Sequence, residues 1–198
     1  MDKTTLKKII VQNHEFILNL DLVSRQEPLE PAASYVFCGI RRCGKSFLQY
    51  QQIQRLIKSQ HTAHFIYINF EDERLIEFQS ADFDLILECG MELYAGQPIL
   101  FFDEIQNIDH WENFARRLAD QGYQVYITGS NAKMLSKEIG TTLGGRYFIR
   151  EIYPLSFYEF LHFRGVQPVK NFAFSKQRFE IKKQFEYYML YGGFPEIL

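Results

Sequence analysis

Hydrophobic residues along the chain fall into two alternating patterns, short apolar runs and longer stretches with helical spacing. The short runs are rich in aromatic and β-branched residues and are typical of strands buried on both faces. They are Tyr35–Cys38, Ala63–Phe70, Ile99–Phe102, Val125–Thr128 and Tyr147–Ile152. The other stretches predict helices at residues 2–27, 45–59, 82–94, 111–120, 132–137, 157–163 and 176–190. We therefore expect an α/β fold with three αβα layers around a mostly parallel, five-stranded sheet.

The same pattern predicts where helices begin, end and face the core. Pro28 and Pro31 are expected to end the first helix before the first strand. Two capping boxes are expected to open later helices, Asp109 with Glu112 and Ser156 with Glu159. In the helix over 45–59, the side chains expected near the core are those of Phe47, Ile53, Leu56 and Ile57.

Composition sets limits on organisation and location. The chain has 198 residues, 46% of them apolar, which is enough for one domain and the start of a second. We expect a helical lead-in over residues 1–30, the main core over 31–165 and the helical start of a further region over 166–198. A net charge of −2 argues against a protein that binds nucleic acid over most of its surface.

The sequence also indicates the cellular compartment of the protein. It has no apolar run near the ~20 residues of a membrane helix, and its N-terminus has no secretory apolar segment. We therefore expect a cytoplasmic protein. Three cysteines in no C-x-x-C pair indicate reduced thiols. Cys43 could be reactive at a helix N-terminus, although a small residue filling a loop position explains it more simply.

The strongest chemical signal is a glycine-rich loop between the first strand and the next helix. It reads G-x-x-x-x-G-K-S and consists of Gly39, Ile40, Arg41, Arg42, Cys43, Gly44, Lys45 and Ser46. Such a loop directs backbone N–H groups and a helix N-terminus at phosphates. We expect Lys45 to reach the β- and γ-phosphates and the Ser46 hydroxyl to bind Mg²⁺. Phe47 completes the residues predicted to bind the nucleotide, ATP or ADP. The alternative is a glycine turn before an ordinary helix.

The second signal is a carboxylate pair at the end of an apolar strand. Asp103 and Glu104 follow Ile99–Phe102, at the strand end where open α/β sheets bind ligands. Asp103 is expected to hold the Mg²⁺ shell, and Glu104 to orient water or to accept its proton. The alternative role for both is to cap the following turn.

Two further polar positions belong to the predicted site. Ser130 and Asn131 end the fourth strand, where a polar side chain could approach the γ-phosphate; either could instead cap the next helix. The acidic residues 71–73 follow the second strand, and we favour helix capping for at least two of them. Arg146 follows a glycine-containing loop and is predicted from its neighbours only as a cation.

Together these motifs resemble one group of prokaryotic AAA+ ATPases. Members carry G-P-R-R-x-G-K-T, D-E-x-Q, T-G-S and G-R followed by P-L-S-F-x-E-F. The matching segments here are 39–46, 103–106, 128–130 and 145–160, so the resemblance covers about residues 30–198. Ile40 stands where proline is usual, and Ser46 where threonine is usual; Ser46 keeps the hydroxyl.

The resemblance implies more than the residues alone. It implies an AAA+-type sheet of order 5-1-4-3-2 and a role for Arg146 like that of an arginine finger or sensor. It also implies a truncated chain, since members continue into a further C-terminal domain. Through that domain a DNA or protein partner could be bound, and a homo-oligomer could form.

The leading hypothesis is an ATP-binding, ATP-hydrolysing domain that uses Mg²⁺. A small-molecule kinase shares the loop, but Asp103 and Glu104 favour water as the nucleophile. A GTPase is disfavoured because no Asn-Lys-x-Asp motif is present. A nucleotide-switched module that binds nucleic acid is the alternative from another class. Its support is the stretch 164–183, with six Lys or Arg residues and one Glu.

Overall fold

The computed structural model describes residues 1–60, 64–130, 134 and 138–197, without the side chains of Gln60 and Glu138. Its contacts divide the chain into two compact units. The first comprises Met1–Gly39 and Lys45–Glu151, and the second comprises Ile40–Gly44 and Ile152–Leu198. Among the described helices, none has the length and apolar character needed to cross a bilayer.

The first unit is built on a parallel sheet of five strands. The strands are β1 Tyr35–Cys38, β2 Phe65–Asn69, β3 Ile99–Asp103, β4 Val125–Gly129 and β5 Phe148–Glu151. They lie in the order β2-β3-β4-β1-β5, and every neighbouring pair is parallel. This is the predicted order 5-1-4-3-2 read from the other edge, so the predicted fold class is confirmed. Short apolar runs identified β1 to β4 because parallel sheets bury both faces. The expectation of a buried strand was wrong for β5, which lies at the edge of the sheet and is exposed along its length.

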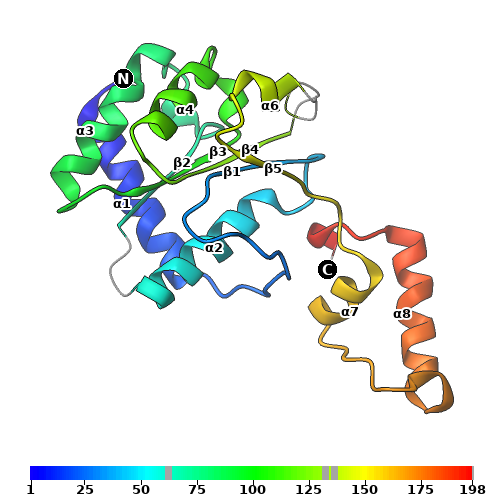
Figure 1. The fold of residues 1–198 in the computed structure, drawn as a ribbon. Helices are drawn as coiled ribbons and strands as arrows, with labels where there is room; N and C mark the ends of the chain where they lie inside the picture. The colour runs from blue at the N-terminus through cyan, green and yellow to red at the C-terminus, as the bar shows by residue number, and fades with distance from the viewer. Residues whose placement is uncertain (61–63, 131–133, 135–137, 198) are drawn as a thin grey trace. The chain divides into compact units, whose positions relative to one another are not determined.

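Helices cover both faces of this sheet, as Figure 1 shows, with α3 and α4 on one side and α2 on the other. The helices of this unit are α1 Lys3–Asn19, α2 Lys45–Gln60, α3 Phe83–Leu93, α4 Trp111–Asp120 and α6 Glu138–Thr142. Alternate strand residues such as Val36, Ile66 and Phe102 form one core with α3 and α4. Trp111, 3% exposed, belongs to that core.

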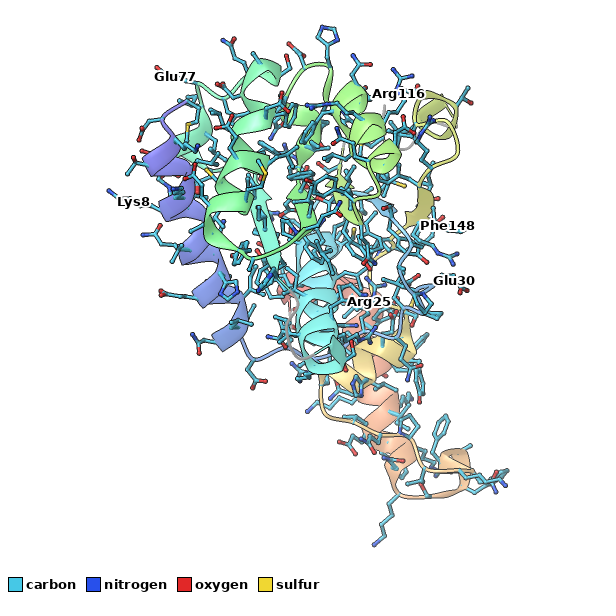
Figure 2. The ribbon with its side chains drawn as sticks, turned by 60° about the vertical axis from the view of Figure 1, so that its left-hand side comes forward. Lys8, Arg25, Glu30, Glu77, Arg116 and Phe148 are labelled. Atoms are coloured by element: carbon cyan, nitrogen blue, oxygen red, sulfur yellow. The ribbon has the colours of Figure 1, made fainter. Side chains whose placement is uncertain are left out.

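The face of the sheet toward α2 carries a row of rings, one from each strand. In order across the sheet these are Phe148, Tyr35, Tyr126, Phe101 and Phe65. Neighbouring ring centroids lie 5.5, 5.9, 4.7 and 6.4 Å apart, within the range of aromatic pairs. Phe148 ends the row on edge strand β5 and is 54% exposed (Figure 2).

Three local predictions differ from the structure. The first helix ends at Asn19, well before Pro28, because Leu20 turns to an extended conformation. The segment after it, with Arg25 and Glu30 (Figure 2), instead lies along α2, where Gln51 hydrogen-bonds the Arg25 backbone at 2.6 and 2.7 Å.

The capping box predicted at Asp109 is also wrong. Helix α4 begins at Trp111 after His110, which has a φ of 59° and makes no side-chain cap. The capping box predicted at Ser156 and Glu159 is present at α7. Of the acidic residues 71–73, Asp72 caps the short helix Glu73–Leu75 and Glu73 lies in its first turn.

The third difference concerns the face of α2. Phe47, predicted near the core, is 58% exposed, whereas Gln49 is fully buried. The Gln49 Nε2 donates to the carbonyl oxygens of Phe102 and Tyr126, both at 3.2 Å, and so joins α2 to β3 and β4. The Gln49 Oε1 is buried without a hydrogen-bond partner among the described residues. A buried glutamine that donates to backbone is not visible in an apolar pattern, and the pattern was therefore wrong for Phe47, although Ile53 is buried as predicted.

The second unit contains two helices, α7 Phe157–Phe163 and α8 Gln177–Tyr191, around a small core. That core comprises Leu155, Phe160, Leu161, Val166 and Ile181. The residues after α8 fold back, so that the Leu155 N–H donates to the Gly193 carbonyl at 2.6 Å. A Cβ on Gly193 would lie 2.1 Å from the Leu155 oxygen, which only glycine avoids.

We expect Gln49→Met to lower the free energy of unfolding by about 1–3 kcal/mol, because two buried carbonyls lose their donor while side-chain volume is kept. Urea denaturation measures the change. Gln26→Met, at an exposed position, is the control and should stay within about 0.5 kcal/mol of the original protein. Equal stability of the Gln49 variant would show that these hydrogen bonds contribute nothing.

Candidate functional site

The candidate site lies one step beyond the row of rings, toward the carboxyl ends of the strands. Two residues after Phe65, Phe101 and Tyr126 come Tyr67, Asp103 and Thr128, on the same face of the sheet. The alternation of strand side chains therefore places a polar row across β2, β3 and β4. At the centre of this row lies the carboxylate of Asp103, a residue that is 2% exposed.

Both oxygens of the Asp103 carboxylate accept hydrogen bonds from neighbouring strands. The Tyr67 hydroxyl donates to Oδ2 at 2.7 Å, and the Thr128 hydroxyl donates to Oδ1. Ser46, the second residue of α2, adds a third side-chain hydrogen bond. A buried charge needs such partners, because an unpaired one costs several kcal/mol.

Burial and hydrogen bonding act on the Asp103 carboxyl in opposite directions. Burial raises its pKa, and the hydrogen bonds from Thr128, Tyr67 and Ser46 lower it. The nearby Glu104 charge raises it further, and the net result is a pKa above the ordinary value. Burial beside Asp103 also raises the pKa of Tyr67 well above its usual range.

Glu104 has an unusual backbone conformation. Its φ and ψ are 50° and 44°, in the left-handed region that few residues other than glycine adopt. Its N–H donates to the Thr128 Oγ1 at 3.0 Å, which helps to hold that conformation. Its Oε2 accepts from the Ser130 hydroxyl at 2.7 Å and from the Gln106 amide at 2.6 Å. Strained residues of this kind concentrate at functional sites.

Lys45 brings a buried cation to the same place. Lys45 is 4% exposed, and its Nζ lies 3.6 Å from the Glu104 Oε1 and 3.3 Å from the Gly39 carbonyl oxygen. It is the first residue of α2, so the positive end of that helix adds to the local charge. The predicted cation and carboxylate are thus held together beside the ends of β1 and β3.

The loop that precedes Lys45 has the backbone expected of a phosphate loop. Arg42 and Gly44 have φ angles of 65° and 95°, and at the second of these glycine avoids strain. Cys43 is fully buried, and all three cysteines are unoxidised thiols. Within the second unit, the Arg42 Nε lies 3.2 Å from the Glu196 carboxylate, and Gly44 lies against Pro195.

The structure brings together the predicted residues Lys45, Ser46, Asp103, Glu104 and Ser130, but not Arg146. Its guanidinium pairs with the Asp120 carboxylate at 2.7 and 3.3 Å. Arg146 lies just before β5, and Asp120 is the last residue of α4. Because the strands are parallel, this pair lies at their amino ends, opposite Lys45 and Glu104. Asn131 lies outside the described residues, and the helix expected at 132–137 does so apart from Met134.

Sequence reasoning missed Thr128, Tyr67 and Gln106. Thr128 stands in the quoted T-G-S motif, but the sequence predicted a site role only for Ser130 and Asn131 at the end of that strand. Tyr67 could have been found from strand alternation, since it occupies the polar row beside Asp103. Gln106 is the last residue of D-E-x-Q, and its amide contacts Glu104. No sequence signal distinguished that contact from an ordinary turn.

The donors present fit Mg²⁺ and a nucleotide. The Asp103 carboxylate and the Ser46 hydroxyl are hard oxygen ligands of the kind that Mg²⁺ takes beside phosphates and water. Among the described residues, no cluster of three or more His, Cys, Asp or Glu side chains could hold a metal ion.

We expect Asp103→Asn to stabilise the ligand-free protein near neutral pH. The folded pKa of Asp103 exceeds its unfolded value near 3.8, so the folded state keeps the proton longer. The stability that protonated Asp103 provides is therefore lost as pH rises through the folded pKa. Urea denaturation at about pH 7 and about pH 4 should show an advantage for the variant that is larger at pH 7.

Asp109→Asn, at an exposed carboxylate, is the matched control and should change little at either pH. A variant less stable than the original protein at about pH 7 would contradict the expected cost of the buried charge.

Comparisons with known proteins identify the family of the chain. Residues 31–161 match the family described as "AAA domain". A Methanocaldococcus jannaschii protein, "Uncharacterized protein MJ1544", is 38% identical over 197 residues, 98% of this chain and 43% of the relative. A Haemophilus influenzae "Uncharacterized protein" is 33% identical over 191 residues, 89% of this chain and 45% of the relative. The chain thus spans less than half the length of these two curated relatives.

Among solved structures, the chain is similar to the Aeropyrum pernix Orc1 protein in complex with DNA. The TM-score is 0.45 at 12% identity, over 82% of this chain and 48% of that one. The family match covers the glycine-rich loop, the carboxylate pair and all five strands. The resemblance drawn from the motifs is therefore confirmed, and the chain belongs to the AAA domain family of P-loop ATP-binding proteins.

Proposed function

We propose that this chain binds ATP and ADP with Mg²⁺ and hydrolyses ATP. The observation that carries the proposal is the placement of Lys45, Glu104 and Asp103 together at the carboxyl ends of β1 and β3. A buried cation at the start of α2 lies beside two carboxylates at the end of β3, one of them on a strained backbone and the other hydrogen-bonded. This arrangement fits a phosphate site better than a structural ion pair.

Each residue has a separate role in this proposal. Lys45 and the loop N–H groups bind the phosphates, while Ser46 and Asp103 hold the metal ion. When bound there, Mg²⁺ would offset the negative charge of the phosphates. Glu104 orients the attacking water and accepts its proton. Ser130 and Gln106 hold the Glu104 carboxylate for that task through the hydrogen bonds described above.

The Lys45–Glu104 ion pair links binding to catalysis. In the ligand-free protein the Lys45 ammonium lies near Glu104, 3.6 Å from its Oε1. A phosphate that attracts Lys45 would release Glu104 from this ion pair while Ser130 and Gln106 keep it in place. The base would therefore become available only when the nucleotide is bound.

The role implied for Arg146 needs a neighbouring molecule. Its pairing with Asp120 puts it at the amino ends of the strands, whereas Lys45 lies beyond their carboxyl ends, so Arg146 does not reach this chain's own site in this conformation. We therefore propose a finger role for Arg146 only toward a nucleotide held by another copy. A DNA or protein partner of this chain is likewise a proposal.

We expect Lys45→Ala to abolish ATP binding, because the phosphates lose their buried cation. Isothermal titration calorimetry with Mg²⁺–ATP measures this. Lys58→Ala, at the exposed last turn of α2, is the control and should bind as the original protein does. Circular dichroism checks that the variant without Lys45 is folded. Equal affinity in a folded Lys45 variant would refute the site.

We expect Glu104→Gln to keep ATP bound and to slow hydrolysis by about 10²–10⁴-fold, since an amide keeps the shape but cannot accept a proton. Phosphate release and calorimetry separate the two effects. Glu73→Gln, an exposed carboxylate after β2, is the control. Equal turnover of the Glu104 variant would remove it from catalysis, and no turnover by the original protein would limit the function to binding.

A further inference from the structure

Tyr67 is connected to the proposed metal site without belonging to the P-loop or the carboxylate pair. It lies on β2, is 3% exposed, and its hydroxyl is 2.7 Å from the Asp103 Oδ2. The Thr128 hydroxyl, on β4, donates to the other oxygen. The strands on both sides of β3 therefore each supply one donor, and together they fix the plane of the carboxylate.

A second tyrosine fixes the direction of this contact. The Tyr50 hydroxyl, on α2, lies 3.2 Å from the Tyr67 hydroxyl. An ionised carboxylate only accepts hydrogen bonds, so Tyr67 gives its single proton to Asp103 and accepts one from Tyr50. The chain of donors thus runs from Tyr50 to Tyr67 to Asp103, and it ties α2 to the carboxylate by a second route besides Ser46.

We propose that Tyr67 is a positioning residue for Asp103, which holds the carboxylate in the orientation that serves the Mg²⁺ of a bound nucleotide. This inference rests on the proposed function. Partners that orient metal-binding carboxylates typically contribute 10–100-fold to metal affinity. Of the roughly four lone pairs of that carboxylate, Tyr67, Thr128 and Ser46 each use one, which leaves one for Mg²⁺ or its water. Tyr50 supports this role from α2.

A purely structural role predicts something different. If Tyr67 only satisfied a buried carboxylate, its loss would lower stability and leave the dependence of ATP binding on Mg²⁺ unchanged. The two roles therefore differ in a binding measurement that needs no turnover.

The test is Tyr67→Phe, studied by calorimetric titration of ATP over a series of Mg²⁺ concentrations and in EDTA. We expect ATP affinity in EDTA to stay within about twofold, because Lys45 and the loop are untouched. The Mg²⁺ concentration that gives half of the gain in affinity should rise about 10–100-fold. Tyr50→Phe should shift it in the same direction by a smaller factor.

Tyr126→Phe is the matched control. Its ring lies in the row next to the site, and its hydroxyl accepts from Gln52 and Gln124 at 3.1 and 2.9 Å instead of contacting Asp103. Its Mg²⁺ dependence should equal that of the original protein. An equal shift in this control would mean general loosening of the sheet and would overturn the inference.

An unchanged Mg²⁺ dependence in Tyr67→Phe would also overturn it, while ATP binding by the original protein would leave the proposed function standing. Failure of the original protein to bind ATP would instead overturn the proposed function. If Tyr67→Phe does not fold, Tyr50→Phe decides, since the absence of any shift there would overturn the inference.

Discussion

The buried Asp103 carboxylate constrains the residues around it on three strands. A charge removed from water inside a sheet covered on both faces needs donors from its immediate neighbours, and only β2 and β4 are adjacent to β3. Tyr67 and Thr128 meet that need at the positions that strand alternation makes available. The same alternation puts the row of rings one step earlier, where it excludes water from the base of the site. The polar residues of the site and the aromatic residues of the core are therefore successive rows on the same face of the sheet.

The unfavourable features of the site are concentrated on two consecutive residues. Asp103 is a buried carboxyl with a raised pKa, and Glu104 has a left-handed backbone. Neither contributes to stability in its own right, and each depends on Thr128, which donates to one and accepts from the backbone of the other. The surrounding apolar core offsets their cost, as is common where function and stability conflict.

The sequence was most informative where one physical requirement dominates. Buried parallel strands must be apolar, and a phosphate loop must have its glycines and lysine, so the strands and Lys45 with Glu104 could be predicted from the residues. The strand order was predicted only through the family resemblance. It was less informative where tertiary hydrogen bonds replace apolar contacts. Gln49 is buried and donates to two strand carbonyls, whereas Phe47, two residues earlier on the same helix, is exposed. Arg146 shows a further limit, since its pairing with Asp120 depends on how α4 and β5 meet.

The position of Trp111 has a spectroscopic consequence. It is the single tryptophan of the chain, and it lies 3% exposed in the core between the sheet and α4. Fluorescence excited in Trp111 alone is therefore sensitive to changes on that side of the sheet, whereas Tyr50, Tyr67 and Tyr126 lie on the side of α2. Emission from Trp111 is suited to following unfolding of the core. Events confined to Lys45 and the start of α2 take place on the other face of the sheet, and their optical signal has to come from the tyrosines or from a labelled nucleotide.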